Sequence, residues 1–239
     1  MGRMFLSHHK FSTILADPPW RFQNRTGKVA PEHKRLLRYR TLNIEEIKAL
    51  PVQNVATPSA HLYLWIPNAL LSFGLEVMES WGFTYKTNLV WFKTRKDGGP
   101  DGRGVGFYFR NVTEIVLFGV RGSLRTLAPG RRQVNLLTSL KREHSRKPDE
   151  LYEIIERCSP GPYLELFARH RRDGWVSFGD ELDFNEAQQE QLILCPRGHH
   201  LGNQEPQEAF LLNQTSFIFY HRFGEDSPID DDEKPPIER

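Results

Sequence analysis

Four consecutive residues, Asp17-Pro18-Pro19-Trp20, place a carboxylate, two prolines and an indole directly after the apolar run 11–16. That run predicts a short buried strand, and ligands bind beyond the carboxyl ends of strands in open α/β sheets. Each proline fixes its own φ and restricts the residue before it, so the turn is rigid without regular structure. The set suits one reaction, methylation of the exocyclic amino nitrogen of a planar base.

The amino nitrogen of adenine is a poor nucleophile because its lone pair is delocalised into the ring. Two acceptors against its two N–H bonds would draw it toward a more nucleophilic, tetrahedral shape, and Asp17 and Pro18 offer a carboxylate and a carbonyl. Trp20 offers a flat face on which a base can stack. A methyl donor held beside the amine would complete the site by proximity. The alternative is an ordinary Asp-Pro-Pro turn with Trp20 as a core aromatic.

Two further segments predict a cofactor pocket. Glu165 and Arg169 end an apolar run, where an acid can accept hydrogen bonds from ribose hydroxyls and an arginine can grip a carboxylate. Lys147 stands before a helix opened by Pro148, next to backbone N–H groups that attract anions. A structural ion pair at Glu165 and a solvated Lys147 are the alternatives.

The hydrophobic pattern predicts strands alternating with helices, hence an α/β sheet covered on both faces. The expected strands are 11–16, 61–66, 87–93, 112–120, 163–169 and 175–178, and the expected helices are 44–50, 68–81 and one starting at Pro148. The basic stretches 21–40 and 95–110 between them are expected to be loops. We expect a main domain over 1–181 and a polar extension over 182–239 with a disordered acidic tip.

The composition indicates an ordinary globular protein. Of 239 residues 38% are hydrophobic and 12% aromatic, which suffices for a substantial core. The formal charge of +2 does not by itself argue for nucleic acid. The two cysteines are far apart, no apolar run is long enough for a membrane span, and the start of the sequence does not resemble a signal peptide. We therefore expect a soluble, cytoplasmic protein without membrane contact. His199 and His200 near Cys195 are too few to make a metal site, so we expect none.

These segments, in this order, resemble the adenine-N6 methyltransferase family typified by the catalytic subunit of the eukaryotic messenger-RNA adenosine methyltransferase. The matching residues are Asp17-Pro18-Pro19-Trp20, Tyr39, Trp91-x-Lys93, Arg110-Asn111-x-x-Glu114, Gly119-Val120-Arg121-Gly122, His144 to Glu150, Ser159-Pro160-Gly161, Glu165-Leu166-Phe167, Trp175 and Gly179. The bacterial and phage branch, mostly DNA methyltransferases, looks closest. The resemblance covers residues 11–181. It implies a Rossmann-like class I S-adenosylmethionine-dependent methyltransferase fold with the catalytic motif N-terminal to the cofactor strand.

The resemblance also implies roles for individual residues. The catalytic set would be Asp17, Pro18, Pro19 and Trp20. The residues that bind S-adenosylmethionine would be Ala16, Asp17, Lys147, Glu165, Arg169, Asp180 and Glu181. The eukaryotic relative has Gly-Asn-Gln where this chain has Gly179-Asp180-Glu181, which leaves the contact of Asp180 in doubt.

Basic loops point to a nucleic acid as the substrate. Phosphate contacts from such loops give affinity at any sequence, although a solvated basic face is the alternative. The expected substrate-binding residues are Tyr39, Lys93, Arg103, Arg110, Arg131, Arg132, Lys141 and Arg142. Duplex DNA is the preferred polymer, by analogy only, with its adenine flipped into the pocket. Several alternatives stay open: RNA as the polymer, a non-catalytic subunit that presents nucleic acid, and a small molecule or protein amide as the substrate. A homodimer and a heterodimer also stay open.

Overall fold

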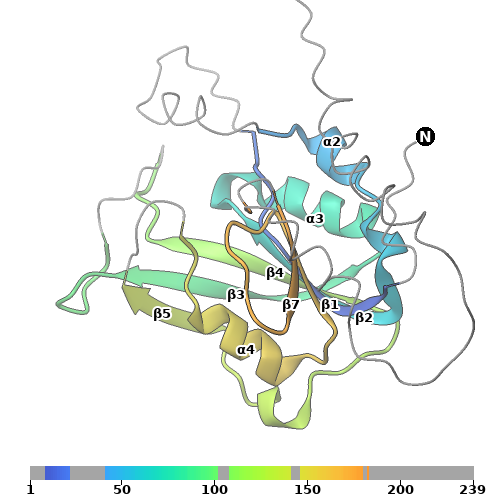
Figure 1. Cartoon of the computed structure of the whole chain (residues 1–239). Coiled ribbons are helices and arrows are strands. Elements are labelled where there is room, and N and C mark those ends of the chain that lie inside the picture. The colour runs from blue at the N-terminus through green and yellow to red at the C-terminus, as the bar shows by residue number, and fades with distance from the viewer. Residues whose placement is uncertain (1–8, 22–40, 102–107, 141–145, 180–181, 183–239) are drawn as a thin grey trace, which may run out of the picture. The chain divides into compact units, whose positions relative to one another are not determined.

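The computed structural model describes residues 9–21, 41–101, 108–140, 146–179 and 182, which fall within one compact unit, His9–Cys195 (Figure 1). The strands are β1 (Phe11–Ala16), β2 (Ala56–Ile66), β3 (Thr84–Thr94), β4 (Thr113–Arg121), β5 (Leu136–Leu140), β6 (Tyr163–Leu166) and β7 (Trp175–Phe178). The helices are α2 (Ile44–Lys48), α3 (Leu71–Ser80) and α4 (Glu150–Cys158), with short 3-10 turns at Val52–Asn54, Asn68–Leu70 and Ala128–Gly130. Leu182, the first residue of the predicted extension, is buried. The rest of that extension lies outside the described residues, so the predicted domain boundary stays a prediction.

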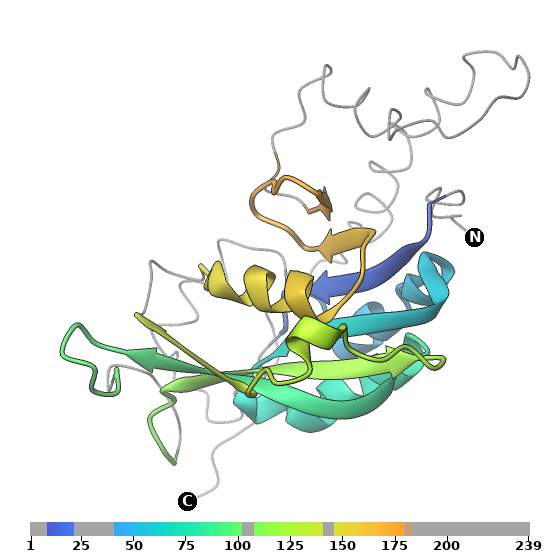
Figure 2. The ribbon, with the colours of Figure 1, turned by 90° about the horizontal axis from the view of Figure 1, so that it is seen from below.

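The seven strands of the described chain form one sheet in the order β5-β3-β4-β2-β1-β6-β7, which Figure 2 shows from β7 in orange to the green strands. β1 runs parallel to β2 and β6, β6 is parallel to β7, and β3 is parallel to β5. β4 is antiparallel to both of its neighbours, β2 and β3. Six strands therefore end at one edge of the sheet, where β4 begins. We call it the carboxyl edge, and the opposite one the amino edge.

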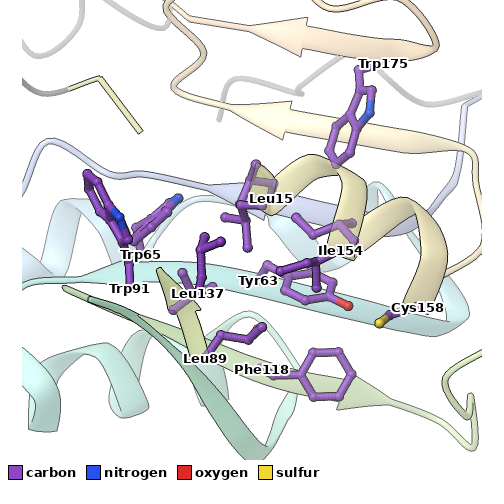
Figure 3. Packing of buried hydrophobic residues seen from close by; sticks show 13 residues of the cluster. Leu15, Tyr63, Trp65, Leu89, Trp91, Phe118, Leu137, Ile154, Cys158 and Trp175 are labelled. Carbon is purple, nitrogen blue, oxygen red and sulfur yellow. The ribbon is translucent and has the colours of Figure 1, made fainter. Parts of the chain in front are cut away.

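Alternating side chains on the central strands build two separate layers of core. Tyr63 and Trp65 of β2 face α4 in a buried cluster that Figure 3 shows, with Trp65 and Trp91 at one end and Cys158 at the other. On the other face α3 packs so closely that a Cβ at Gly74 would lie 2.8 Å from the Ile66 side chain. Figure 1 shows α3 and α4 on opposite sides of the strands. The prediction of a Rossmann-like α/β fold covered on both faces is confirmed, and the Asp17-Pro18-Pro19-Trp20 turn precedes β6, the strand that carries Glu165.

Several elements differ from the prediction, β3 among them, which runs from Thr84 to Thr94 rather than over 87–93. β6 ends at Leu166 rather than at 169, because Phe167 takes a φ of 64°, in the left-handed region that breaks a strand. β5 was missed within a segment expected to be loops, since a short, half-exposed edge strand carries little hydrophobic pattern. β2 starts earlier, at Ala56, and the helix predicted over 68–81 divides into a 3-10 turn and α3. In the described part of the chain no helix is both long and apolar enough to cross a membrane.

Candidate active site

Hydrogen bonds within and beside the Asp17-Pro18-Pro19-Trp20 turn fix its shape at the carboxyl edge. The Trp20 amide donates to the Pro18 carbonyl at 2.8 Å, and the Leu42 amide donates to the Pro19 carbonyl at 2.9 Å. The Pro18 oxygen is thus already an acceptor, and its second lone pair is left for another donor. The expected rigidity of the turn is therefore present, with a hydrogen bond added to the effect of the prolines.

The carboxylate of Asp17 begins a line of alternating charges drawn from three strands and the segment before α4. The Lys147 ammonium lies 3.3 Å from Asp17 Oδ2 and 2.9 Å from Glu114 Oε2. The Lys93 ammonium donates to the other oxygen of Glu114, Oε1. Lys93 comes from the end of β3 and Glu114 from the start of β4, which the antiparallel pairing brings to the same edge. We call Asp17, Lys147, Glu114 and Lys93 the charge line.

Two indoles flank the charge line. The Lys147 nitrogen lies 4.6 Å from the ring centroid of Trp65, and the Lys93 nitrogen lies 4.8 Å from that of Trp91. The two rings meet edge to face with centroids 6.1 Å apart. A cation over an aromatic face is attracted to it, by about 2 kcal/mol or more when desolvated. The indoles therefore hold both ammonium groups in place from one side.

Trp20 does not offer the open stacking face that the sequence predicts. Only 5% of the residue is exposed, and its indole N–H donates to the Trp65 carbonyl at 2.9 Å. The bond ties the turn to the end of β2. The alternative interpretation, a core aromatic, therefore describes Trp20 better than a base platform.

Burial and neighbouring charges shift the pKa values of the charge line. Desolvation raises the pKa of Asp17, an effect that Lys147 opposes and Glu114 reinforces. Desolvation would also raise the pKa of Glu114, but Lys147 and Lys93 together hold it at about 2. The carboxylates in turn raise the pKa of Lys147 above its usual value, although burial alone would lower it. Glu114 is therefore anionic and Lys147 cationic at neutral pH, while Asp17 has an increased affinity for a proton.

Glu165, on β6 next to Asp17, has one oxygen bonded and one open. The Tyr152 hydroxyl donates to its Oε1 at 2.8 Å, and its buried Oε2 has no hydrogen-bond partner among the described residues. Burial raises the pKa of Glu165 to about 7. The adjacent β7 residue, Ser177, also has a buried oxygen without a described partner. A buried acceptor left open costs stability unless a ligand fills it, so Glu165 fits a group that presents hydroxyl donors, such as a ribose.

The rigid turn at Asp17 thus lies beside Glu165, a carboxylate with one open oxygen on the neighbouring strand. The family comparison spans both residues. The model of the MT-A70 family matches residues 11–181 of the chain. The chain belongs to the MT-A70 family. The span holds the charge line, Glu165 and the whole described sheet, which confirms the family predicted from the sequence.

Several curated proteins are similar to about three quarters of the chain. A protein of Medicago truncatula named putative N(6)-adenosine-methyltransferase MT-A70-like is 33% identical over 179 residues, covering 72% of this chain and 26% of the relative. The human N(6)-adenosine-methyltransferase catalytic subunit METTL3 is 30% identical over 178 residues, covering 73% and 28%. The type II methyltransferase M.MunI of Mycoplasma sp is 29% identical over 197 residues, covering 76% and 82%. The chain thus spans about a quarter of the eukaryotic relatives and most of the bacterial one.

The structure gathers most of the described site residues of this MT-A70 chain at the carboxyl edge. Lys93 lies in the charge line, Arg110 is exposed in the connection that enters β4, and the charge of Arg169 lowers the pKa of Asp17. Ala16 is fully buried at the end of β1. The predicted residues Tyr39, Arg103, Lys141, Arg142, Asp180 and Glu181 lie outside the described part of the chain.

Arg131 and Arg132 are not brought to the candidate site. They follow the 3-10 turn 128–130. This turn packs against the far end of α4, so closely that a Cβ added at Gly130 would clash with Cys158. β4 ends and β5 begins at the amino edge, so this connection lies opposite Asp17. The prediction placed these two arginines at the site because they stand in a basic stretch of the sequence. The structure places them at the amino edge instead.

Three residues of the site had no role predicted from the sequence. Glu114 stood in a matching motif without an assigned contact, and Trp65 was expected only as part of a strand. Tyr152 follows the buried Leu151 on α4, and its hydroxyl reaches β6. The only signal in the sequence was the family motif around Glu114, because the contacts of Trp65 and Tyr152 arise from packing.

Proposed function

We propose that this chain is an S-adenosylmethionine-dependent methyltransferase acting on the N6 amine of adenine in nucleic acid, DNA in the first place. The observation that carries the proposal is the Asp17 turn, whose carboxylate is paired with Lys147 yet stays 28% exposed at the carboxyl edge. The open oxygen of Glu165 on the next strand supports a ribose beside it.

The residues of the site have separate tasks in this reaction. S-adenosylmethionine, when bound, supplies a methyl group activated by its sulfonium. Asp17 and the second lone pair of the Pro18 carbonyl accept the two N–H bonds of the amine and orient its lone pair. Asp17 is also the carboxylate on which the released proton is held, since burial raises its pKa. Lys147 keeps it ionised beforehand, and Glu165 Oε2 accepts from the ribose.

DNA is proposed as the polymer because the similarity extends over 82% of a type II methyltransferase. The similarity to N(6)-adenosine-methyltransferases such as METTL3 favours RNA as the second candidate. Incubation with labelled S-adenosylmethionine and either duplex DNA or single-stranded RNA, followed by nucleoside analysis, separates them. We expect N6-methyldeoxyadenosine from the DNA. Label in RNA alone would reverse the choice of polymer, and no label in either would favour a non-catalytic subunit.

The pKa of Glu165 predicts how cofactor affinity depends on pH. A ligand that donates hydroxyls to the ionised carboxylate binds better as the pH rises through about 7. At pH 6 about one tenth of Glu165 is ionised, so the dissociation constant is expected to be about tenfold larger than at pH 8. Calorimetric titration of the wild-type protein and of Glu165→Gln measures this.

The comparison of the two proteins isolates Glu165, because every other titrating group, including those of the ligand, is common to both. We expect the Gln variant to bind more weakly at pH 8 and to lose the tenfold dependence. Equal slopes in both proteins would place the ribose elsewhere.

The two edges of the sheet allow a matched test of the basic segments. Lys141 and Arg142 follow β5 directly in the sequence, where it ends at the carboxyl edge, whereas Arg131 and Arg132 lie toward the amino edge. Each phosphate contact on duplex DNA contributes about 0.9 to the slope of log affinity against log salt. Neutralising the first pair should lower the slope by up to about 1.8, and neutralising the second should leave it unchanged. The reverse pattern would move the nucleic-acid surface to the amino edge.

A further inference from the structure

Glu114 uses each of its oxygens for a different lysine. Oε1 accepts from Lys93 and Oε2 accepts from Lys147 at 2.9 Å, within the range of a strong charge-assisted hydrogen bond. The side chain of Glu114 is 29% exposed and those of the two lysines 17% and 23%, so water screens these bonds only in part. Both carboxylate oxygens of Glu114 are thereby held in place, one by the end of β3 and the other by the segment that enters α4.

The position of Lys147 is uneven between its two carboxylates. Its nitrogen is 2.9 Å from Glu114 and 3.3 Å from Asp17, so the shorter contact is with Glu114. The indole of Trp65, 4.6 Å away, contacts the same ammonium. A lysine facing Asp17 alone would close on it and occupy the carboxylate that the adenine amine must reach.

We propose that Glu114 is a positioning residue: it holds Lys147 at a distance that keeps Asp17 ionised while leaving its carboxylate accessible, and Lys93 holds Glu114. The role of Asp17 toward the amine rests on the function proposed above, whereas the restraint on Lys147 is a property of the protein alone. Glu114 itself has no contact with substrate in this scheme.

The charges around Asp17 agree with this arrangement. Lys147 and Arg169 lower its pKa, and Glu114 and the burial of the carboxyl raise it. Glu165 on the neighbouring strand couples to Asp17 as well, since the charge of Asp17 raises the pKa of Glu165. Removing Glu114 alone would therefore strengthen the hold of Lys147 on Asp17 and lower the pKa of Asp17, rather than release it.

The first test measures Lys147 directly and needs no substrate. The 13Cε signal of Lys147, identified by its absence in Lys147→Arg, is followed against pH in the wild-type protein and in Glu114→Gln. Loss of one anionic partner is expected to lower the pKa of Lys147 by about one unit, because the closer approach of Lys147 to Asp17 offsets only part of the lost attraction. Glu45→Gln is the matched control, because it removes one of the two carboxylate partners of the surface Lys48, Glu45 and Glu76, and should leave Lys147 unchanged. An unchanged pKa in Glu114→Gln would overturn the proposal.

A second variant guards against misfolding. Glu114→Asp keeps the charge but is one methylene too short to reach both lysines, so a partial fall in the pKa of Lys147 is expected. If Glu114→Gln does not fold, this variant decides: a pKa of Lys147 equal to that of the wild type would overturn the proposal.

The second test is a kinetic double-mutant cycle of Glu114→Gln, Lys147→Met and their combination. Residues that act through one another are not additive. We expect Glu114→Gln to lower kcat about tenfold or more, to shift the acid limb of its pH profile downward, and to change the cofactor dissociation constant little. The combined variant should be no slower than Lys147→Met. Multiplied losses in the combined variant would show that Glu114 acts on its own and overturn the proposal.

The two tests fail separately. If the wild-type protein methylates neither DNA nor RNA, the proposed function fails, while the titration of Lys147 still decides whether Glu114 restrains it. If methylation occurs but Lys147 titrates alike in wild-type protein and Glu114→Gln, the positioning role fails and the function stands.

Discussion

Replacing Asp17 by asparagine is expected to lower kcat by about 10³-fold or more at saturating cofactor, with the fold retained. Loss of one positioned polar group in an active site costs on the order of 10²–10³ in rate. Here the same side chain is asked both to polarise the amine and to take up its proton, and an amide does the first weakly and the second not at all. The change from carboxylate to amide is nearly isosteric, so the turn should keep its shape.

The stability of this variant should not fall. The pKa of Asp17 is raised in the folded protein, so the folded state holds more protons than the unfolded one over the range between the two pKa values. Stability attributable to this carboxyl then decreases as the pH rises, and the ionised form at neutral pH is the less favourable one. Asp17→Asn removes that cost, and its free energy of unfolding in urea at pH 7 is expected to equal or exceed that of the wild type.

Asp97→Asn is the matched control for Asp17→Asn. Asp97 lies in the exposed turn after β3, where it pairs with Arg95 at 2.9 Å. The same chemical change there should leave kcat unchanged. An Asp17→Asn enzyme that turns over within a few fold of the wild type would remove the carboxylate from the mechanism.

The turn could be predicted from the sequence because what makes it rigid is local. Two prolines restrict their own backbone and that of the residue before them, whatever surrounds them. Its place at the carboxyl edge followed from the apolar run before it. The surroundings of Trp20 could not be predicted in this way, since its burial depends on Trp65, 45 residues away in the sequence.

Glu114 shows why the rest of the site needed the structure. In a parallel sheet the residues after each strand are the candidates for a site, and Glu114 stands at the start of its strand. It reaches the carboxyl edge because β4 is antiparallel to its neighbours, and pairing direction is not readable from one strand's residues. The prediction for Arg131 and Arg132 was wrong for a related reason. These residues precede β5, and that strand was not predicted from the sequence.

Replacing Lys147 by methionine is expected to lower kcat about 10²-fold at pH 7 and to make the rate recover as the pH rises. Lys147 lowers the pKa of Asp17, whereas desolvation and Glu114 raise it. Without the ammonium, Asp17 is protonated over a wider pH range, and each unit of upward shift leaves about tenfold less of the ionised form below the new pKa. Rates measured from pH 6 to 9 with saturating cofactor should therefore rise with pH further than those of the wild type.

Lys147→Arg keeps the charge and serves as the control. Because the cation remains, this variant should show a loss in kcat from altered geometry but an acid limb close to that of the wild type. Glu114 also remains anionic in Lys147→Met, next to Lys93 alone, so thermal unfolding of each variant is compared first. A loss in Lys147→Met that is the same at every pH would mean that Lys147 serves the reaction by contact with the cofactor. Another cation would then keep Asp17 ionised, and Arg169 is the candidate because its charge also lowers the pKa of Asp17.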